Sequence, residues 1–82
     1  MQLEILTPSK NIFSGEVKLV KVPGSKGSFE ILKNHATIIS TLTKGELKME
    51  TESGEAFHYQ ISGGTVEVKN NHIVVLVESI TE

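Results

Sequence analysis

The sequence predicts an all-β protein: a small antiparallel β-sandwich, or flattened barrel, of about ten short strands in a single domain spanning residues 1–82. Three observations lead to this prediction: residue usage, apolar–polar alternation, and turn residues at short intervals. Val, Ile and Thr occur eight, eight and seven times, whereas Ala occurs only twice. β-Branched residues favour sheets and alanine favours helices. Short strands separated by turns at roughly ten-residue intervals are typical of small sandwiches and barrels.

Residues 45–78 predict an up-and-down meander of four strands. Polar and apolar residues alternate over residues 46–51, 57–61 and 65–69, as in strands buried on one face. Ser53-Gly54 and Asn70-Asn71 are typical hairpin turns, because glycine and asparagine tolerate positive φ, and Gly63-Gly64 predicts a sharp bend. Residues 73–77 are apolar throughout. They indicate either a central strand covered on both faces or a strand whose outer face packs against another polypeptide.

The N-terminal half is strand-like but less regular. Residues 2–6 predict a first strand, which the polar stretch at 8–11 ends. Val17 and Leu19 share one face, but Val20 and Val22 share the other, so the alternation changes phase within the segment. This change predicts a β-bulge or a strand that passes from one sheet to another. Loops are expected at 23–28 and 33–35, with short strands at 29–32 and 38–42.

Composition argues against several classes of function. The net charge is −2, with eight lysines and no arginine, whereas nucleic-acid-binding domains usually present a basic face rich in arginine. Cysteine and aspartate are absent, which argues against disulfides, thiolate nucleophiles and zinc–thiolate sites. No run approaches 18 apolar residues, and the first residues do not resemble a signal peptide. A location on the cytoplasmic side is therefore expected, with membrane contact only through a partner.

No catalytic, cofactor-binding or metal site is expected. His35 could be combined with Ser14 or Ser40 and a glutamate into a triad, but no sequence motif places them together. The spacing of His58 and His72 fits no metal-ligand pattern, and His58 is expected to face solvent. Residues 24–28 superficially resemble a phosphate-binding loop. That motif requires a following helix and a different lysine position, so this interpretation is rejected.

Lys48 offers an alternative function. Leu47-Lys48-Met49 resembles the segment that carries biotin or lipoate in small β-sandwich carrier domains. In those domains the modified lysine lies at an exposed hairpin tip. Here the nearest turn, Ser53-Gly54, comes five residues later, so Lys48 is expected in the middle of a strand.

The order of motifs along the chain resembles one known family. The motifs are Phe13-Ser14-Gly15-Glu16-Val17, residues 22–32 (VPGSKGSFEIL), Asn34-His35-Ala36, residues 42–45, residues 61–68 (ISGGTVEV) and residues 74–76. In this order and spacing they are similar to the N-terminal β-sandwich of the ε subunit of the F-type ATP synthase. The resemblance implies a structural subunit of the central stalk, not an enzyme, without cofactors. It also implies a peripheral position on the cytoplasmic face of the bacterial inner membrane.

The resemblance implies two partners, the γ subunit and the ring of c subunits, with which the ε subunit rotates, driven by protons or sodium ions. The family's c-ring-facing loops correspond to residues 33–40 and to Pro23, Gly24, Ser25, Lys26, Gly27, Ser28, Phe29 and Glu30. The residues expected to face γ are His35, Ile38, Ser40, Val74 and Leu76. Of these, Val74 and Leu76 derive from the doubly apolar segment at 73–77.

Two departures from the family pattern bear on function. Thr37 stands where many members have proline after the Asn-His-Ala loop, so the rigidity of this loop does not transfer. The family usually continues into a C-terminal helical hairpin that inhibits ATP hydrolysis and in some members binds ATP. The sequence ends at Glu82, so no C-terminal helical domain is expected and neither role is carried over. The missing hairpin fits either a natural short form, which the family includes, or a truncation, and the start at Met1 favours the natural form.

Overall fold

A computed structural model describes residues 1–81, which form nine β-strands and no helix. The strands are β1 (Gln2–Leu6), β2 (Asn11–Gly24), β3 (Gly27–Leu32), β4 (Ile38–Leu42), β5 (Gly45–Thr51), β6 (Ala56–Ile61), β7 (Gly64–Lys69), β8 (His72–Val77) and β9 (Ile80–Thr81). The all-β prediction is confirmed, with nine strands where about ten were expected. No described segment is a helix that could cross a membrane.

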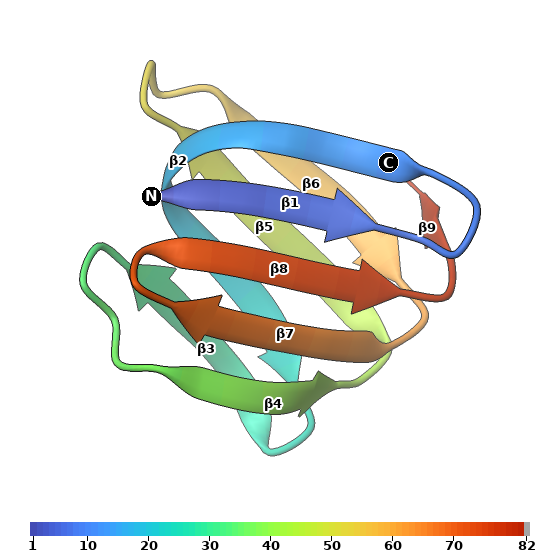
Figure 1. Ribbon diagram of the computed structural model, residues 1–82. Coiled ribbons are helices and arrows are strands. Elements are labelled where there is room, and N and C mark those ends of the chain that lie inside the picture. The colour runs from blue at the N-terminus through green and yellow to red at the C-terminus, as the bar shows by residue number, and fades with distance from the viewer. Residues whose placement is uncertain (82) are drawn as a thin grey trace.

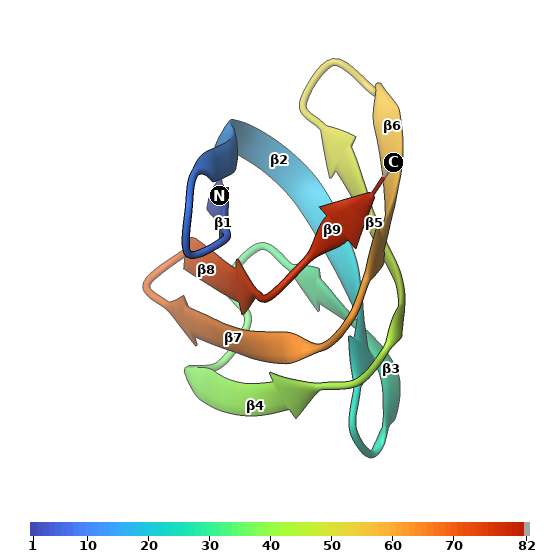
Figure 2. The ribbon, with the colours of Figure 1, turned by 90° about the vertical axis from the view of Figure 1, so that its right-hand side faces the viewer.

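The strands form two layers that face each other (Figures 1 and 2). The front layer contains the first half of β2 followed by β1, β8, β7 and β4, and the rear layer contains β3, the second half of β2, β5, β6 and β9. The predicted antiparallel sandwich is therefore confirmed with one exception, because β1 and β8 pair in parallel.

Strand β2 joins the layers, as the phase change in its sequence predicted. Its first half pairs with β1, and its second half pairs with β3 and β5. The register with β5 shifts between Val17 and Leu19. This irregularity lets both Val17 and Val20 point into the core, where each is fully buried.

The expected meander over residues 45–78 is wrong in one respect. β5 pairs with β6 and β7 pairs with β8, but β6 and β7 are not neighbours, since β6 continues to β9 and β7 continues to β4. Gly63 and Gly64, at φ values of 129° and 155°, connect the rear layer to the front layer instead of closing a hairpin. The turns at Gly54 and at Asn70-Asn71, all with positive φ, are confirmed.

The core lies between the layers and is built from both. Leu3, Ile5 and Val66 of the front layer and Leu47 and Met49 of the rear layer are completely buried. No charged residue among the described residues 1–81 is buried. Apolar side chains therefore hold the two layers together.

The exposure of the β8 side chains decides between the two interpretations of this apolar strand. Ile73, Val75 and Val77 are buried in the core, whereas Leu76 on the opposite face is 49% exposed and Val74 is half-buried. The interpretation that both faces are covered within this chain is therefore wrong. The outward face of β8 is available to another polypeptide.

Candidate docking surfaces

The segment expected to face the c-ring is a tight hairpin and not the open loop predicted for residues 23–28. β2 extends to Gly24 and β3 begins at Gly27, which leaves only Ser25 and Lys26 in the turn. A Cβ on Gly24 would lie 2.7 Å from the carbonyl oxygen of Gly27 and 2.8 Å from the Phe29 ring. Only glycine allows this close packing at the base of the turn.

The β2–β3 hairpin is attached to the end of β4. The Ser25 amide donates to the Thr41 carbonyl at 3.1 Å, and the Thr43 amide donates to the Pro23 carbonyl at 2.8 Å. The Ser25 and Thr41 hydroxyl oxygens are 2.7 Å apart. These contacts fix the hairpin to the body of the domain.

The eight residues expected to face the c-ring differ in exposure. Pro23 and Gly24 are buried, and Phe29 is half-buried. The residues exposed enough to meet a partner are Ser25, Lys26, Gly27, Ser28 and Glu30. The accessible part of this predicted surface is thus polar and lies at the hairpin tip, at the lower end of the molecule in Figure 1.

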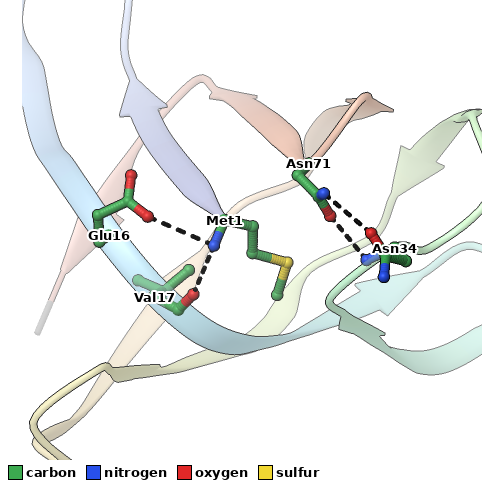
Figure 3. A network of polar contacts seen from close by, with 5 residues as sticks. All are labelled: Met1, Glu16, Val17, Asn34 and Asn71. Carbon is green, nitrogen blue, oxygen red and sulfur yellow. Dashed lines mark hydrogen bonds and ion pairs between the residues drawn. The ribbon is translucent and has the colours of Figure 1, made fainter.

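The Asn-His-Ala loop is tied to the turn between β7 and β8. The backbone N–H of Asn34 donates to Asn71 Oδ1 at 2.6 Å, and the side-chain Nδ2 of Asn71 donates to Asn34 Oδ1 at 3.0 Å (Figure 3). Both asparagines have positive φ, 66° and 60°. His35 Nδ1 donates to the Ala36 carbonyl at 2.8 Å. This reciprocal pair, together with that local bond, gives the loop a defined position even though Thr37 replaces the proline of the family pattern.

The five residues expected to face γ lie in three places: the inner face of the front layer, its outer face, and the loop before β4. Ile38 and Ser40 pair with Val68 and Val66, which are buried, so they point toward the core. Val74 and Leu76 lie on the outward face, and His35 is half-buried in the loop before β4. The five side chains therefore do not form one surface.

Ile39, which is 76% exposed, is not among the residues that the sequence predicts to face a partner. It pairs with Glu67, which in turn pairs with Val74, so Ile39 and Val74 share the outward face. Two apolar residues stand side by side at 38 and 39, and only one can face the core. The pairing of β4 with β7, which the sequence does not reveal, decides which one.

The outward face of the front layer carries four apolar side chains, called here the outer apolar patch. Leu6, Val74 and Leu76 adjoin one another, with Leu6 and Val74 half-buried, and Ile39 lies one strand farther, beyond Glu67. Leu6 pairs with Leu76 across the parallel β1–β8 ladder. A groove of about 340 Å³ adjoins these two leucines, and Pro8 forms part of its wall. Exposed apolar clusters of this kind mark sites of protein contact.

Acidic groups stand among and beside the side chains of the outer apolar patch, since Glu67 lies between Ile39 and Val74. Glu67 and Glu4 occupy the positions on either side of Val74 in the same cross-strand row. Glu4 also contacts His72, with Nε2 and Oε2 2.6 Å apart. A partner surface with an apolar centre and nearby lysine or arginine side chains would complement this face.

The remaining chemical candidates stay apart. Lys48 lies in the middle of β5, paired with Lys21 on one side and His58 on the other, and not at a hairpin tip, so the carrier alternative is not favoured. His58 is exposed and contacts Glu46 at 3.4 Å. Within residues 1–81, no three His, Cys, Asp or Glu side chains are grouped as metal ligands.

The sequence matches a family model described as "ATP synthase, Delta/Epsilon chain, beta-sandwich domain" over residues 1–82. The chain belongs to this family. The match confirms the family that the sequence motifs indicated and the predicted β-sandwich fold.

Curated relatives in this family are ATP synthase epsilon chains. That of Desulforamulus reducens is 41% identical over 78 residues, covering 95% of this chain and 58% of the relative. That of Chlorobium limicola is 38% identical over 80 residues, covering 98% of this chain and 91% of the relative. The chain therefore spans little more than half the length of the first relative and nine-tenths of the second.

Two solved structures share the family's sandwich fold. A chain in the cryo-EM structure of the Euglena gracilis mitochondrial ATP synthase superposes with a TM-score of 0.90 at 23% identity, covering 96% of this chain and 51% of that chain. A chain of the Tetrahymena thermophila mitochondrial ATP synthase, in a structure of its central stalk and c-ring, gives a TM-score of 0.84 at 18% identity, covering 99% and 65%. At these identities the similarity is one of fold.

Proposed function

We propose that this chain is a non-catalytic central-stalk subunit of an F-type ATP synthase, which couples proton- or sodium-driven rotation to ATP synthesis. The observation that carries the proposal is the family match along the entire chain. The single β-sandwich domain, residues 1–82, acts by contact. Through the complex it is held at the cytoplasmic face of a bacterial inner membrane.

The outer apolar patch is the surface proposed to dock on γ. Val74 and Leu76 belong to the set expected from sequence, and Ile39 takes the place of the inward-pointing Ile38 and Ser40. Complete burial of a large aliphatic side chain contributes about 1.5–3 kcal/mol. Ile39 and Leu76, which are 76% and 49% exposed, therefore supply a substantial part of the contact energy when a partner covers them. The neighbouring Glu4 and Glu67 favour a basic rim on that partner.

The tip of the β2–β3 hairpin is the surface proposed to meet the c-ring. Its exposed residues are polar and its base is held by the contacts to Thr41 and Thr43. A rigid polar tip can exchange hydrogen bonds and charge pairs with polar loops of a ring. Ser28 and Glu30, which are both exposed, are proposed as the contact residues.

The γ assignment is tested by affinity for purified γ. The double variant Ile39→Glu, Leu76→Glu is expected to weaken binding at least tenfold, since it places two charges in the apolar contact. Leu32→Glu is the matched control, because Leu32 is 50% exposed but belongs to β3 of the rear layer. The γ assignment is wrong if Leu32→Glu weakens binding and the double variant binds normally.

The c-ring assignment is tested in membranes by ATP-driven proton pumping and by assembly of the complex. The variant Ser28→Trp, Glu30→Lys is expected to impair both, because it adds bulk and reverses a charge at the tip. Glu55→Lys makes the same charge reversal at an exposed turn next to Gly54 and should have no effect. Unaltered pumping and assembly in the hairpin variant would contradict the assignment.

A further inference from the structure

Two lysines occupy directly opposed positions on the outward face of the rear layer. Lys21 of β2 pairs with Lys48 of β5, so their side chains emerge next to each other. Like charges at opposed positions of an antiparallel pair repel and destabilise the sheet. Among the residues that the structure describes, neither ammonium group forms an ion pair.

Three carboxylates lie near this lysine pair, but none forms an ion pair with it among the described residues. Glu50 contacts Lys18 at 3.3 Å, and Glu46 contacts His58 at 3.4 Å. Glu30 stands opposite Lys21 on the β3 side but forms no ion pair with it. The row that runs from β2 to β6 therefore presents two adjacent ammonium groups, neither of which has a direct ion-pair partner among residues 1–81.

The lysine pair borders a hollow of about 490 Å³ between the β2–β3 hairpin and the connection from β4 to β5. Lys44, in that connection, supplies a third ammonium group to the wall. Three hydroxyl groups also line the hollow, those of Ser25, Ser28 and Thr43. The Glu46 carboxylate also lines the hollow and contacts His58 at 3.4 Å. The hollow thus combines three ammonium groups, one carboxylate and neutral hydrogen-bond donors in one concave place.

We propose that this hollow, called here the lysine hollow, binds a phosphate group, either as a free phosphate compound or as the headgroup of an anionic phospholipid. Phosphate oxygens accept strong charge-assisted hydrogen bonds from ammonium groups, and the remaining oxygens can accept from hydroxyls. A bound phosphate would also offset the repulsion between Lys21 and Lys48. The mode of binding differs from that of a phosphate loop, because a strand follows Gly27 and the charge comes from two neighbouring strands.

This inference goes beyond the proposed function, which requires no ligand, and it can fail independently of it. The relation between the two is one of position: the lysine hollow shares Ser25 and Ser28 with the hairpin tip proposed to face the c-ring. An anionic headgroup at the membrane surface would lie on the same side of the domain. Binding by the isolated chain is therefore measured without γ or the c-ring.

The test is a titration of the 82-residue chain with inorganic pyrophosphate, followed by backbone amide NMR shifts, alongside co-sedimentation with phosphatidylglycerol–phosphatidylcholine vesicles. Saturable shifts at the amides that line the hollow, decreasing at higher salt, indicate a site for free phosphate. Co-sedimentation that requires phosphatidylglycerol indicates a headgroup site. Either result supports the proposal when it depends on Lys21 and Lys48.

The dependence is measured with the variant Lys21→Gln, Lys48→Gln. It is expected to weaken binding at least about fivefold, since each lysine supplies a charge-assisted hydrogen bond. Lys69→Gln, a loss of charge on the exposed face of the front layer, should change binding less than about twofold. The lysine variant is expected to unfold at no lower temperature than the parent chain, because it removes a repulsion.

Two results would overturn the proposal. One is the absence of both saturable pyrophosphate shifts and phosphatidylglycerol-dependent sedimentation. The other is found with single variants. If Lys69→Gln weakens binding as much as Lys21→Gln alone and Lys48→Gln alone do, binding depends on the net charge of the chain and not on this hollow.

Discussion

Replacing Gly64 with alanine tests whether the crossing between the two layers determines the fold. Gly64 begins β7 and pairs with Val77 of β8. A Cβ at this position would overlap the carbonyl oxygen of Leu76 and stand 3.0 Å from the Leu76 carbonyl carbon and the Val77 Cα. All three are backbone atoms, so no side-chain rotation relieves the overlap, and β7 and β8 must separate locally.

The size of the effect follows from these contacts. Separation of the strands costs about two backbone hydrogen bonds at roughly 1 kcal/mol each. An alanine at a φ of 155° adds backbone strain of about 1 kcal/mol or more. The sum is a loss of at least about 3 kcal/mol, from a total unfolding free energy of roughly 4–12 kcal/mol for a chain of this length.

Gly54→Ala is the matched control. Gly54 also has a positive φ, 93°, but a Cβ there would meet no atom within 4 Å. This substitution therefore introduces backbone strain alone, about 1–2 kcal/mol. Urea unfolding followed by circular dichroism measures both variants. The reasoning about Gly64 is refuted if Gly64→Ala loses no more stability than Gly54→Ala.

Further substitutions test the core, the exposed face and the loop contact. Leu47→Ala, at a completely buried position, should lower the unfolding free energy by about 2–4 kcal/mol in urea titration. Ile39→Ala, at a position 76% exposed, should change it by less than about 0.5 kcal/mol, and a core-sized loss would contradict its outward orientation. Asn34→Ala and Asn71→Ala, combined in a double-mutant cycle by thermal unfolding, should show a coupling of about 0.5–1 kcal/mol, and additivity would contradict their reciprocal contact.

Alternation and turn chemistry in the sequence predict most strand positions but not which strands are neighbours. The phase change between Val17 and Val20 correctly indicates a strand that joins two sheets, because a register shift is the physical way to place both valines in the core. The residues of β6 and β7 are as compatible with a meander as with the observed passage of the chain from one layer to the other. Alternation reveals which face is buried, whereas neighbours are selected by packing between layers.

The same distinction limits prediction of the docking surface. Leu76 could be assigned to an outward face because residues 73–77 are apolar throughout and only alternate positions can enter one core. Ile38 and Ile39 could not be told apart, since each fits a strand and the choice depends on pairing with β7. The sequence predicts a loop at 23–28 where the structure has a tight hairpin, because the Gly-Ser-Lys-Gly turn has the composition of a longer loop.

Site-specific cross-linking in the assembled complex tests the central claim, docking on γ and the c-ring, most directly. The sequence contains no cysteine, so a single introduced cysteine carrying a thiol-reactive photo-cross-linker reports one position. Ile39→Cys is predicted to cross-link to γ and Ser28→Cys to a c subunit. Leu32→Cys, at a position that is 50% exposed but on the rear layer, is predicted to cross-link to neither. Cross-linking of Leu32→Cys to γ, with none from Ile39→Cys, would contradict the proposed orientation. Failure of all three variants to cross-link, in chains that fold normally, would contradict the central-stalk role itself.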